Sequence, residues 1–391
     1  MKIKEWLPVL TLTLAAFVFN TSEFVPIGLL SDIALDLHVT EAKAGVLIST
    51  YAWAVALASL PLMTLFSKTE YRALLRAVVG VFTLSHALSA IADSYAMLMA
   101  SRMGVAFSHA IFWSVANPLA IKVAPEGRGP LAMSLIMTGT SLAQVLGLPL
   151  GRIIGLALGW RLTFLCMGAI ALAVLIILAT LFPKVENETE FSARDLPLIL
   201  RNRRLSAIYI IIILLVTGHF TAYSYIEPFL LGVAGFPQMR VTVAIMLFGF
   251  AGVIASILFS RFYPHHLKLL ALFAAGGIAT SLFLARPISS HVSAILALCI
   301  FWGICVSMVN LVFQAELIAT EKKATTVAMA LYSSLFNIGI GTGAFVGGRV
   351  SESLGIGCIG VCGAFMALAG TIAAFLYIRS AGNTPLPDSI R

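Results

Sequence analysis

Stretches of about 20 apolar residues recur along this chain almost from end to end, and they constrain its fold more than any other feature. A helix of that length crosses the roughly 30 Å hydrocarbon core of a bilayer. We count about twelve such stretches, centred near residues 18, 55, 82, 109, 144, 171, 218, 249, 276, 305, 338 and 366. Because lipid cannot satisfy free backbone N–H and C=O groups, each stretch is predicted to be a membrane-spanning helix.

The composition supports the same class of protein. Hydrophobic residues make up 60% of the chain and charged residues 11%, whereas roughly 25% of residues are charged in soluble domains. Apolar and polar residues do not alternate with the strand period that a membrane β-barrel requires. The sequence therefore predicts an all-α integral membrane protein with twelve transmembrane helices.

The positions of lysine and arginine predict the orientation. If the N-terminus is inside, most of the 25 basic side chains fall in the inner connections and the two ends, and the outer connections hold Lys43, Arg161, Arg240 and Arg286. This asymmetry follows the positive-inside rule with both termini cytoplasmic. The net charge of +8 thus reflects topology and gives no reason to expect nucleic acid as a partner.

A polar stretch near the middle of the chain divides the predicted spans into two sets of six. We predict an N-terminal six-helix bundle over 1–182, a cytoplasmic linker over 183–204 and a C-terminal six-helix bundle with a short tail over 205–391. The two halves also share dipeptides at related places. The matching pairs are Gly151-Arg152 with Gly348-Arg349, and Phe112-Trp113 with Phe301-Trp302. Such a six-plus-six parallel repeat is the architecture of major facilitator transporters, which bind substrate near the membrane midplane.

Glu23 lies deep inside the first apolar stretch, with no Lys, Arg or Asp between Trp6 and Leu30. A carboxylate in hydrocarbon is costly, so an intramembrane acid indicates a functional site. At 1.5 Å per residue, Glu23 and Arg102 come out at similar depth in the outer third of the membrane. These two residues, with His109 near the middle of the fourth span, are the candidates for proton coupling. The alternative is a structural Glu–Arg pair that joins the first helix to the fourth.

A binding site for a neutral, hydroxylated substrate needs hydrogen-bonding side chains and an aromatic platform. The spans expected to face the cavity supply both kinds. The candidates are Asn20, Thr21, His109, Phe112, Trp113, Gln144, His219, Tyr223, Tyr225, Glu227, Trp302, Asn310 and Asn337. Each of them also fits a helix–helix hydrogen bond or simple packing. Glu227, near the outer end of the seventh span, is a candidate gate or vestibule residue.

The sequence carries no catalytic, cofactor or metal-binding signature. Its five cysteines lie in apolar segments, where a thiol usually behaves as a small hydrophobe. Cys358 and Cys362 share a helix face, but no histidine or carboxylate accompanies them. We therefore expect a transporter without cofactor or bound metal rather than an enzyme.

Four segments carry a resemblance to a known family. They run from Asn20 to Leu30, from Ser101 to Trp113, from Gly147 to Arg152 and from Tyr223 to Phe229. The chain resembles the bacterial sugar efflux transporters of the SotB type, in the drug:proton antiporter branch of the major facilitator superfamily, over nearly its whole length.

The resemblance implies a proton-driven exporter of small sugars such as arabinose and thiogalactoside or lactose analogues. It would work by alternating access in the bacterial inner membrane, as a multi-pass protein that functions as a monomer. The alternative within the same superfamily is a proton-coupled exporter of drugs or nucleosides. A membrane enzyme or a non-transporting sensor has less support, because no reactive signature or signalling domain is present in this sequence.

Two details refine the resemblance. In the segment Gly147 to Gly151, Pro149 removes a backbone hydrogen bond and predicts a bend or gating point in the fifth span. The segment resembles the antiporter motif of exporters, which favours efflux. In the connection after the second span, Ser67 stands where the family usually has an aspartate, so the gating contacts are expected to differ.

Arg152 and Arg349 end related spans, and both are expected to snorkel to the outer interface.

Overall fold

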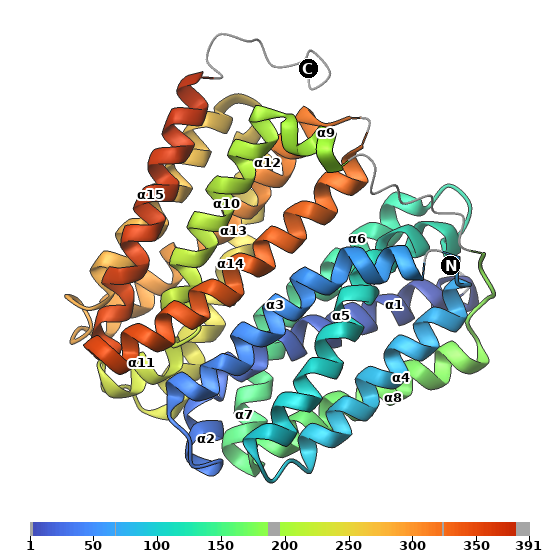
Figure 1. Cartoon of the computed structure of the whole chain (residues 1–391), viewed down its shortest axis with the longest axis horizontal. Helices are drawn as coiled ribbons and strands as arrows, with labels where there is room; N and C mark the ends of the chain where they lie inside the picture. The colour runs from blue at the N-terminus through green and yellow to red at the C-terminus, as the bar shows by residue number, and fades with distance from the viewer. Residues whose placement is uncertain (1–2, 67, 187–195, 323, 381–391) are drawn as a thin grey trace. The chain divides into compact units, whose positions relative to one another are not determined.

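The computed structural model describes residues 3–66, 68–186, 196–322 and 324–380, and these residues form helices and short connections without a β-strand (Figure 1). Twelve of the helical segments are long and apolar enough to cross a membrane. The predicted all-α membrane fold with twelve spans is therefore confirmed. Ser67, the acidic middle of the predicted linker and the C-terminal tail lie outside the described residues.

The helices fall into two compact units. Unit 1 comprises Met1–Thr40 and Thr50–Phe191, and unit 2 comprises Glu41–Ser49 and Ser192–Arg391. The helices up to the middle of the chain are α1 (Ile3–Gly28), α2 (Leu30–Asp36), α3 (Glu41–Leu65), α4 (Tyr71–Ala90), α5 (Tyr95–Val123), α6 (Gly129–Leu142), a π-helical segment (Ala143–Gly147), α7 (Leu148–Leu158) and α8 (Trp160–Thr180). The first residues of α3 are thus part of unit 2, and the rest of that helix is part of unit 1.

The second half of the chain follows the same plan. Its helices are α9 (Leu196–Arg201), α10 (Arg203–Tyr223), α11 (Ile226–Gly232), α12 (Gln238–Ala285), α13 (Val292–Thr320), α14 (Thr325–Leu354), a 3₁₀ turn (Ile356–Cys358) and α15 (Ile359–Ser380). The long α12 contains two spans, because its backbone leaves helical geometry at His266. The π-helical segment, by contrast, joins α6 and α7 into one span.

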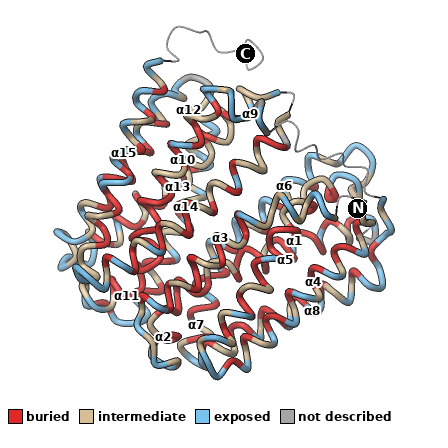
Figure 2. Tube along the Cα trace, in the orientation of Figure 1, coloured by how far each residue is buried: buried red, intermediate tan, exposed pale blue. Residues whose placement is uncertain are grey.

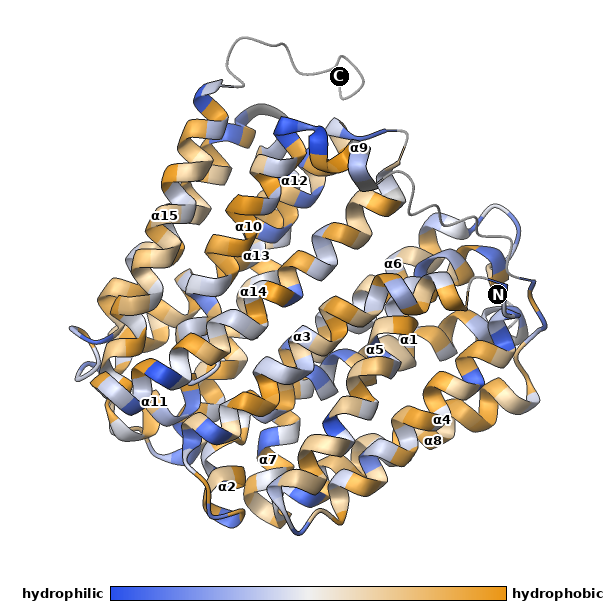
Figure 3. Ribbon diagram, viewed as in Figure 1, coloured by the Kyte–Doolittle hydropathy of each residue, from blue (hydrophilic) through white to orange (hydrophobic). Residues whose placement is uncertain are grey.

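Large apolar side chains cover much of the helical surface. Leu57, Leu84 and Phe365 are 72%, 71% and 62% exposed. Figure 3 shows apolar residues running along the helices, and Figure 2 shows buried and exposed residues alternating on the same helices. Exposed apolar surface of this extent is unfavourable in water, so these faces are suited to lipid.

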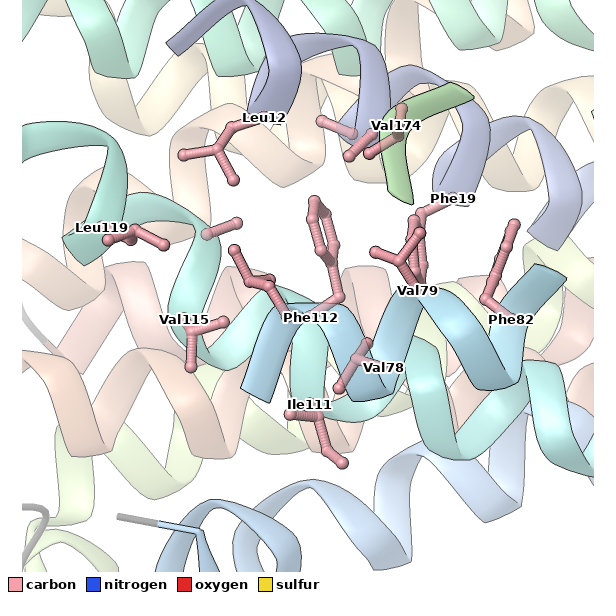
Figure 4. Packing of buried hydrophobic residues seen from close by; sticks show 14 of the residues in the cluster. Leu12, Phe19, Val78, Val79, Phe82, Ile111, Phe112, Val115, Leu119 and Val174 are labelled. Atoms are coloured by element: carbon pink, nitrogen blue, oxygen red, sulfur yellow. The ribbon is translucent and has the colours of Figure 1, made fainter. Parts of the chain in front are cut away.

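An aromatic stack fixes α1 inside unit 1. Phe19 of α1 lies between Phe82 of α4, at a ring-centroid distance of 4.0 Å, and Phe112 of α5, at 4.3 Å. All three side chains belong to the buried core, and Figure 4 shows them with their apolar neighbours. Because Glu23 follows Phe19 by one helical turn, the stack also sets the position of Glu23.

Both units pack their first helix against their fifth in the same register. A Cβ atom on Gly147 would collide with the Thr21 hydroxyl in unit 1, and one on Gly343 would lie 2.6 Å from the Thr217 carbonyl oxygen in unit 2. The sequence separation from Thr21 to Gly147 equals that from Thr217 to Gly343. Such close approach requires glycine. The shared register supports the internal repeat that the dipeptide matches predicted.

The bend predicted at Pro149 takes the form of the π-helical segment immediately before it. Pro149 is the second residue of α7 and has no N–H to donate to the preceding turn. The helix widens over Ala143–Gly147 as a result, which is a common way to accommodate an interrupted hydrogen-bond ladder. Gly151, one turn further on, lies directly against Val25 of α1.

Candidate functional site

Polar and charged side chains meet inside unit 1, where α1, α3, α4 and α5 pack together. The members of this cluster are Ser22, Glu23, Tyr51, His86, Arg102 and His109. The Glu23 carboxylate lies 3.7 Å from Nε2 of His109, and its side chain is only 10% exposed. A buried carboxylate next to a histidine can exchange a proton, since both groups bind protons reversibly.

Arg102 supplies the positive charge of this cluster. Its guanidinium donates a hydrogen bond to the Ser22 hydroxyl at 3.3 Å and lies 4.4 Å from the centre of the Tyr51 ring. It is almost completely buried, and it interacts electrostatically with Glu23. The structure therefore brings together Glu23, Arg102 and His109, the three residues predicted for proton coupling.

Three members of the cluster were not among the predicted site residues. Ser22 links the cluster to α1, Tyr51 covers the face of Arg102, and His86 lies 2.9 Å from the Ser22 hydroxyl. His86 carried a usable signal in the sequence, because an ionisable residue inside a membrane span is rare unless it has a function. Tyr51 and Ser22 carried none, since both residue types are common in spans.

The predicted substrate residues of α1 are engaged with the neighbouring helices. The Asn20 side-chain amide donates to the Thr140 carbonyl at 3.3 Å, and Thr21 packs against Gly147. Gln144 is exposed on the π-helical segment. Asn20 and Thr21 therefore contribute to helix packing as they stand, and a role in substrate binding remains a prediction for all three.

The predicted aromatic pair of α5 divides between two environments. Phe112 is fully buried in the stack with Phe19. Trp113 is half-buried, 5.3 Å from Phe112 and 6.0 Å from His109 between ring centres. Part of the Trp113 side chain is therefore accessible, whereas Phe112 is enclosed by its packing partners.

In unit 2, aromatic rings gather around His219. Its ring centre lies 4.9 Å from Tyr223, 5.3 Å from Trp302 and 5.8 Å from Phe248. Phe248, on α12, was not predicted, because one phenylalanine among many carries no signal. The predicted residues His219, Tyr223 and Trp302 are thus brought together in one aromatic cluster.

Hydrogen bonds engage three of the remaining predicted residues of unit 2. The Tyr225 hydroxyl donates to the Ala344 carbonyl at 3.0 Å and ties α10 to α14. Asn310 accepts hydrogen bonds from Gln314 and Tyr332. The Asn337 amide donates to the backbone one turn earlier. Glu227, predicted near the outer end of the seventh span, lies in the first turn of α11, and its side chain is completely buried.

The two units differ at matching positions. In the shared register, Glu23 follows Thr21 in α1 as His219 follows Thr217 in α10. The first position is surrounded by charged and polar groups, and the second by aromatic rings. The same helix pairing therefore holds an acid in unit 1 and an aromatic cluster in unit 2.

The expectation that Arg152 snorkels to the interface is wrong. Arg152 is fully buried and donates a hydrogen bond to the Gly28 carbonyl at the end of α1. A helix C-terminus attracts a cation, which explains why the guanidinium turns inward. Burial raises the pKa of nearby Asp32, and Arg152 offsets part of that rise. Arg349, by contrast, is exposed and 3.5 Å from the Glu352 carboxylate.

Among the residues that the structure describes, no group of three His, Cys, Asp or Glu side chains is arranged to hold a metal ion.

Comparison with known proteins identifies the family. The model of the Major Facilitator Superfamily matches residues 12–317, most of the chain. The chain is also similar to a crystal structure of a bacterial homolog of the human lysosomal transporter Spinster, described as inward-facing and unoccupied. That likeness has a TM-score of 0.75 at 15% sequence identity and covers 97% of this chain and 98% of the other. At this identity the likeness concerns the fold alone. With its twelve spans and the family match, the chain is a membrane transporter that belongs to the major facilitator superfamily.

Proposed function

We propose that this transporter exports small sugars, such as arabinose and thiogalactoside or lactose analogues, in exchange for protons. It would act by alternating access in the bacterial inner membrane, with both termini in the cytoplasm. The observation that carries the proposal is the buried Glu23 carboxylate, 3.7 Å from His109 and under the electrostatic influence of Arg102. A proton antiporter needs one group that binds a proton on one side and releases it on the other.

The surroundings of Glu23 are suited to that exchange. The apolar core around Phe19 disfavours the ionised carboxylate, and the positive charge of Arg102 favours it. Opposing influences of this kind allow both protonation states to be populated in one cycle. In the proposed cycle, a Glu23 carboxylate oxygen takes up a proton from the outside and releases it to the cytoplasm, and sugar moves in the opposite direction.

The sugar specificity rests on different support. The whole-chain resemblance to sugar efflux transporters is its main argument, and the cluster of His219, Tyr223 and Trp302, whose rings are buried against one another in this structure, adds to it. Sugar rings bind to sites that combine aromatic platforms with a few hydrogen-bonding groups. The same aromatic cluster also suits the flat ring of a nucleoside or drug, which keeps a drug or nucleoside exporter as the second candidate.

Transport by the purified protein in proteoliposomes, under an imposed proton gradient, tests the proposal. Labelled arabinose, a lactose analogue, a nucleoside and a cationic drug are offered separately. We expect the sugars to move against their gradient. If the nucleoside or the drug moves and no sugar does, the second candidate is correct. If no sugar moves and none raises the thermal stability of the protein, the sugar proposal fails.

The Glu23→Gln variant tests the coupling. We expect gradient-driven transport to fall to the level of protein-free vesicles, because the amide cannot carry a proton. Sugar binding, measured by thermal stabilisation, should remain. Glu126→Gln, which changes an exposed acid between α5 and α6, serves as the matched control and should transport normally. Unchanged pumping by Glu23→Gln would rule out Glu23 as the coupling acid.

A further inference from the structure

His86 is a buried, polar ring that the coupling proposal does not use. It lies on α4 and is completely enclosed. Its ring centre is 4.4 Å from that of Phe82 and 5.8 Å from that of Phe164. Helix α8, which also carries Phe164, approaches closely. A Cβ atom on Gly168 would lie 3.1 Å from the Cβ atom of His86. The ring is therefore fixed by packing, and its nitrogen atoms have defined positions.

The hydrogen bonds around Ser22 define how this ring is used. Nε2 of His86 lies 2.9 Å from the Ser22 hydroxyl, and Arg102 donates to the same hydroxyl at 3.3 Å. A guanidinium has donors only, so the Ser22 oxygen accepts from Arg102. The Ser22 hydroxyl keeps its own proton and a second lone pair, so it also forms a hydrogen bond with Nε2 of His86, as donor or as acceptor according to the tautomer of the ring. A chain of hydrogen bonds thus links Arg102 through Ser22 to His86.

This chain determines where the Arg102 guanidinium sits. Arg102 directs its hydrogen bond to Ser22 and its flat face to Tyr51, and it acts on Glu23 through space. A guanidinium released from Ser22 would be drawn towards the Glu23 carboxylate, the negatively charged group that already acts on it electrostatically. A direct ion pair would hold Glu23 in its ionised form.

We propose that His86 is a positioning residue that acts through Ser22 to keep Arg102 out of a direct ion pair with Glu23. The carboxylate then remains able to take up and release a proton. The consequence for transport rests on the proposed function, in which Glu23 is the coupling acid. The geometric claim itself concerns only the titration of Glu23, and it can be tested without substrate or gradient.

The other ionisable groups that act on Glu23 come from two helices. Tyr51 belongs to α3, and Arg102 and His109 belong to α5. From α7, Arg152 is directed to the Gly28 carbonyl and interacts with Asp32. The hydrogen bonds around His86 lead to Ser22 and from there to Arg102, and neither His86 nor Ser22 takes part in the contact between Glu23 and His109.

The test is a pH titration of the Glu23 carboxyl band by difference infrared spectroscopy on the purified protein. Glu23→Gln identifies the band by removing it. His86→Phe retains an aromatic ring next to Phe82 and Phe164 but has no hydrogen-bonding group for Ser22. Ser22→Ala breaks the same chain without enlarging any side chain. His86→Gln keeps an acceptor oxygen close to the position of Nε2.

We expect the Glu23 midpoint to move to lower pH by about one unit or more in His86→Phe and Ser22→Ala, because Arg102 then pairs with the carboxylate. The midpoint of His86→Gln should stay near that of the unchanged protein. An unmoved midpoint in Ser22→Ala would overturn the inference, as would equal shifts in His86→Phe and His86→Gln. If the expected shifts occur but no sugar is transported, the inference stands and the proposed function fails.

Discussion

Two arginines, Arg102 and Arg152, are almost completely enclosed by the protein. Each directs a guanidinium nitrogen to a neutral oxygen, the Ser22 hydroxyl in one case and the Gly28 carbonyl in the other. A hydrogen bond to a charged group contributes about 1.5–3 kcal/mol to stability. These two side chains therefore hold α1 in place at two levels, next to Glu23 and at the end of the helix.

A third charged residue acts at the start of α4. The Glu70 side chain accepts hydrogen bonds from the backbone N–H groups of Arg72 at 2.7 Å, Ala73 at 3.0 Å and Val185 at 3.0 Å. Desolvation raises the pKa of the Glu70 carboxyl. The three backbone hydrogen bonds, with a smaller contribution from Arg76, lower it by more, so the pKa lies below its usual value. Glu70 thus caps α4 and fastens it to the segment that follows α8.

We predict that Glu70→Ala lowers the stability of the protein by about 0.5–2 kcal/mol at neutral pH, the usual cost of losing a helix cap. Because the folded-state pKa is lowered, the stabilisation is present above the unfolded value of 4.5 and is lost as the pH falls through the folded value. Thermal unfolding in detergent, from about pH 7 down to about pH 3, measures the difference. Glu70→Gln, which keeps one acceptor oxygen, should lose less. If Glu70→Ala destabilised the protein equally at all pH values, the role of the ionised Glu70 carboxylate as the helix cap would be contradicted.

At the level of helices, glycine decides how closely neighbouring spans approach. A Cβ atom on Gly139 of α6 would lie 2.5 Å from the Thr13 carbonyl oxygen of α1, and one on Gly343 of α14 would lie 2.6 Å from the Thr217 carbonyl oxygen of α10. Backbone atoms cannot move aside as a flexible side chain can. A backbone contact of this kind therefore limits how closely the fifth helix of each unit can approach the first.

We predict that Gly139→Ala and Gly343→Ala each destabilise the protein by about 1–3 kcal/mol, the cost of forcing an extra carbon into a packed contact. Gly80 of α4 has open space around its Cα, so Gly80→Ala is the matched control. It should be neutral or stabilising by up to about 1 kcal/mol, because alanine favours the helix. Thermal unfolding of the three variants in one detergent compares them. Equal effects of all three substitutions would show that the close contacts do not matter.

For the whole molecule, the distribution of lysine and arginine makes a prediction about orientation. Most of the 25 basic side chains lie in alternate connections and at the two ends of the chain, so both termini should be cytoplasmic. A green fluorescent protein fused after Arg391 should therefore fluoresce, and an alkaline phosphatase fused there should be inactive. Fusions after His291, in the connection between α12 and α13, should give the reverse pattern. Active phosphatase at the C-terminus would reverse the proposed orientation.

Hydropathy along the chain was enough to predict the twelve spans and the all-α membrane fold. It also marked Glu23, because a carboxylate is conspicuous among apolar residues whatever its neighbours are. The depth estimate brought Arg102 to the same level, and the structure places both residues in one cluster with His109. These properties depend on helix length and composition, which can be read without knowing how a helix is rotated.

Rotation and packing could not be read in this way. Whether Arg152 reaches the interface or turns inward depends on the position of the Gly28 carbonyl, which belongs to another helix. Whether Phe112 offers its ring to a substrate or stacks on Phe19 depends on which faces meet. The link from His86 through Ser22 to Arg102 joins three helices. A linear sequence shows which polar and charged groups are costly to bury. Only three-dimensional packing selects the partners that offset this cost, because each buried polar group needs a hydrogen bond or ion pair, often from elsewhere in the chain.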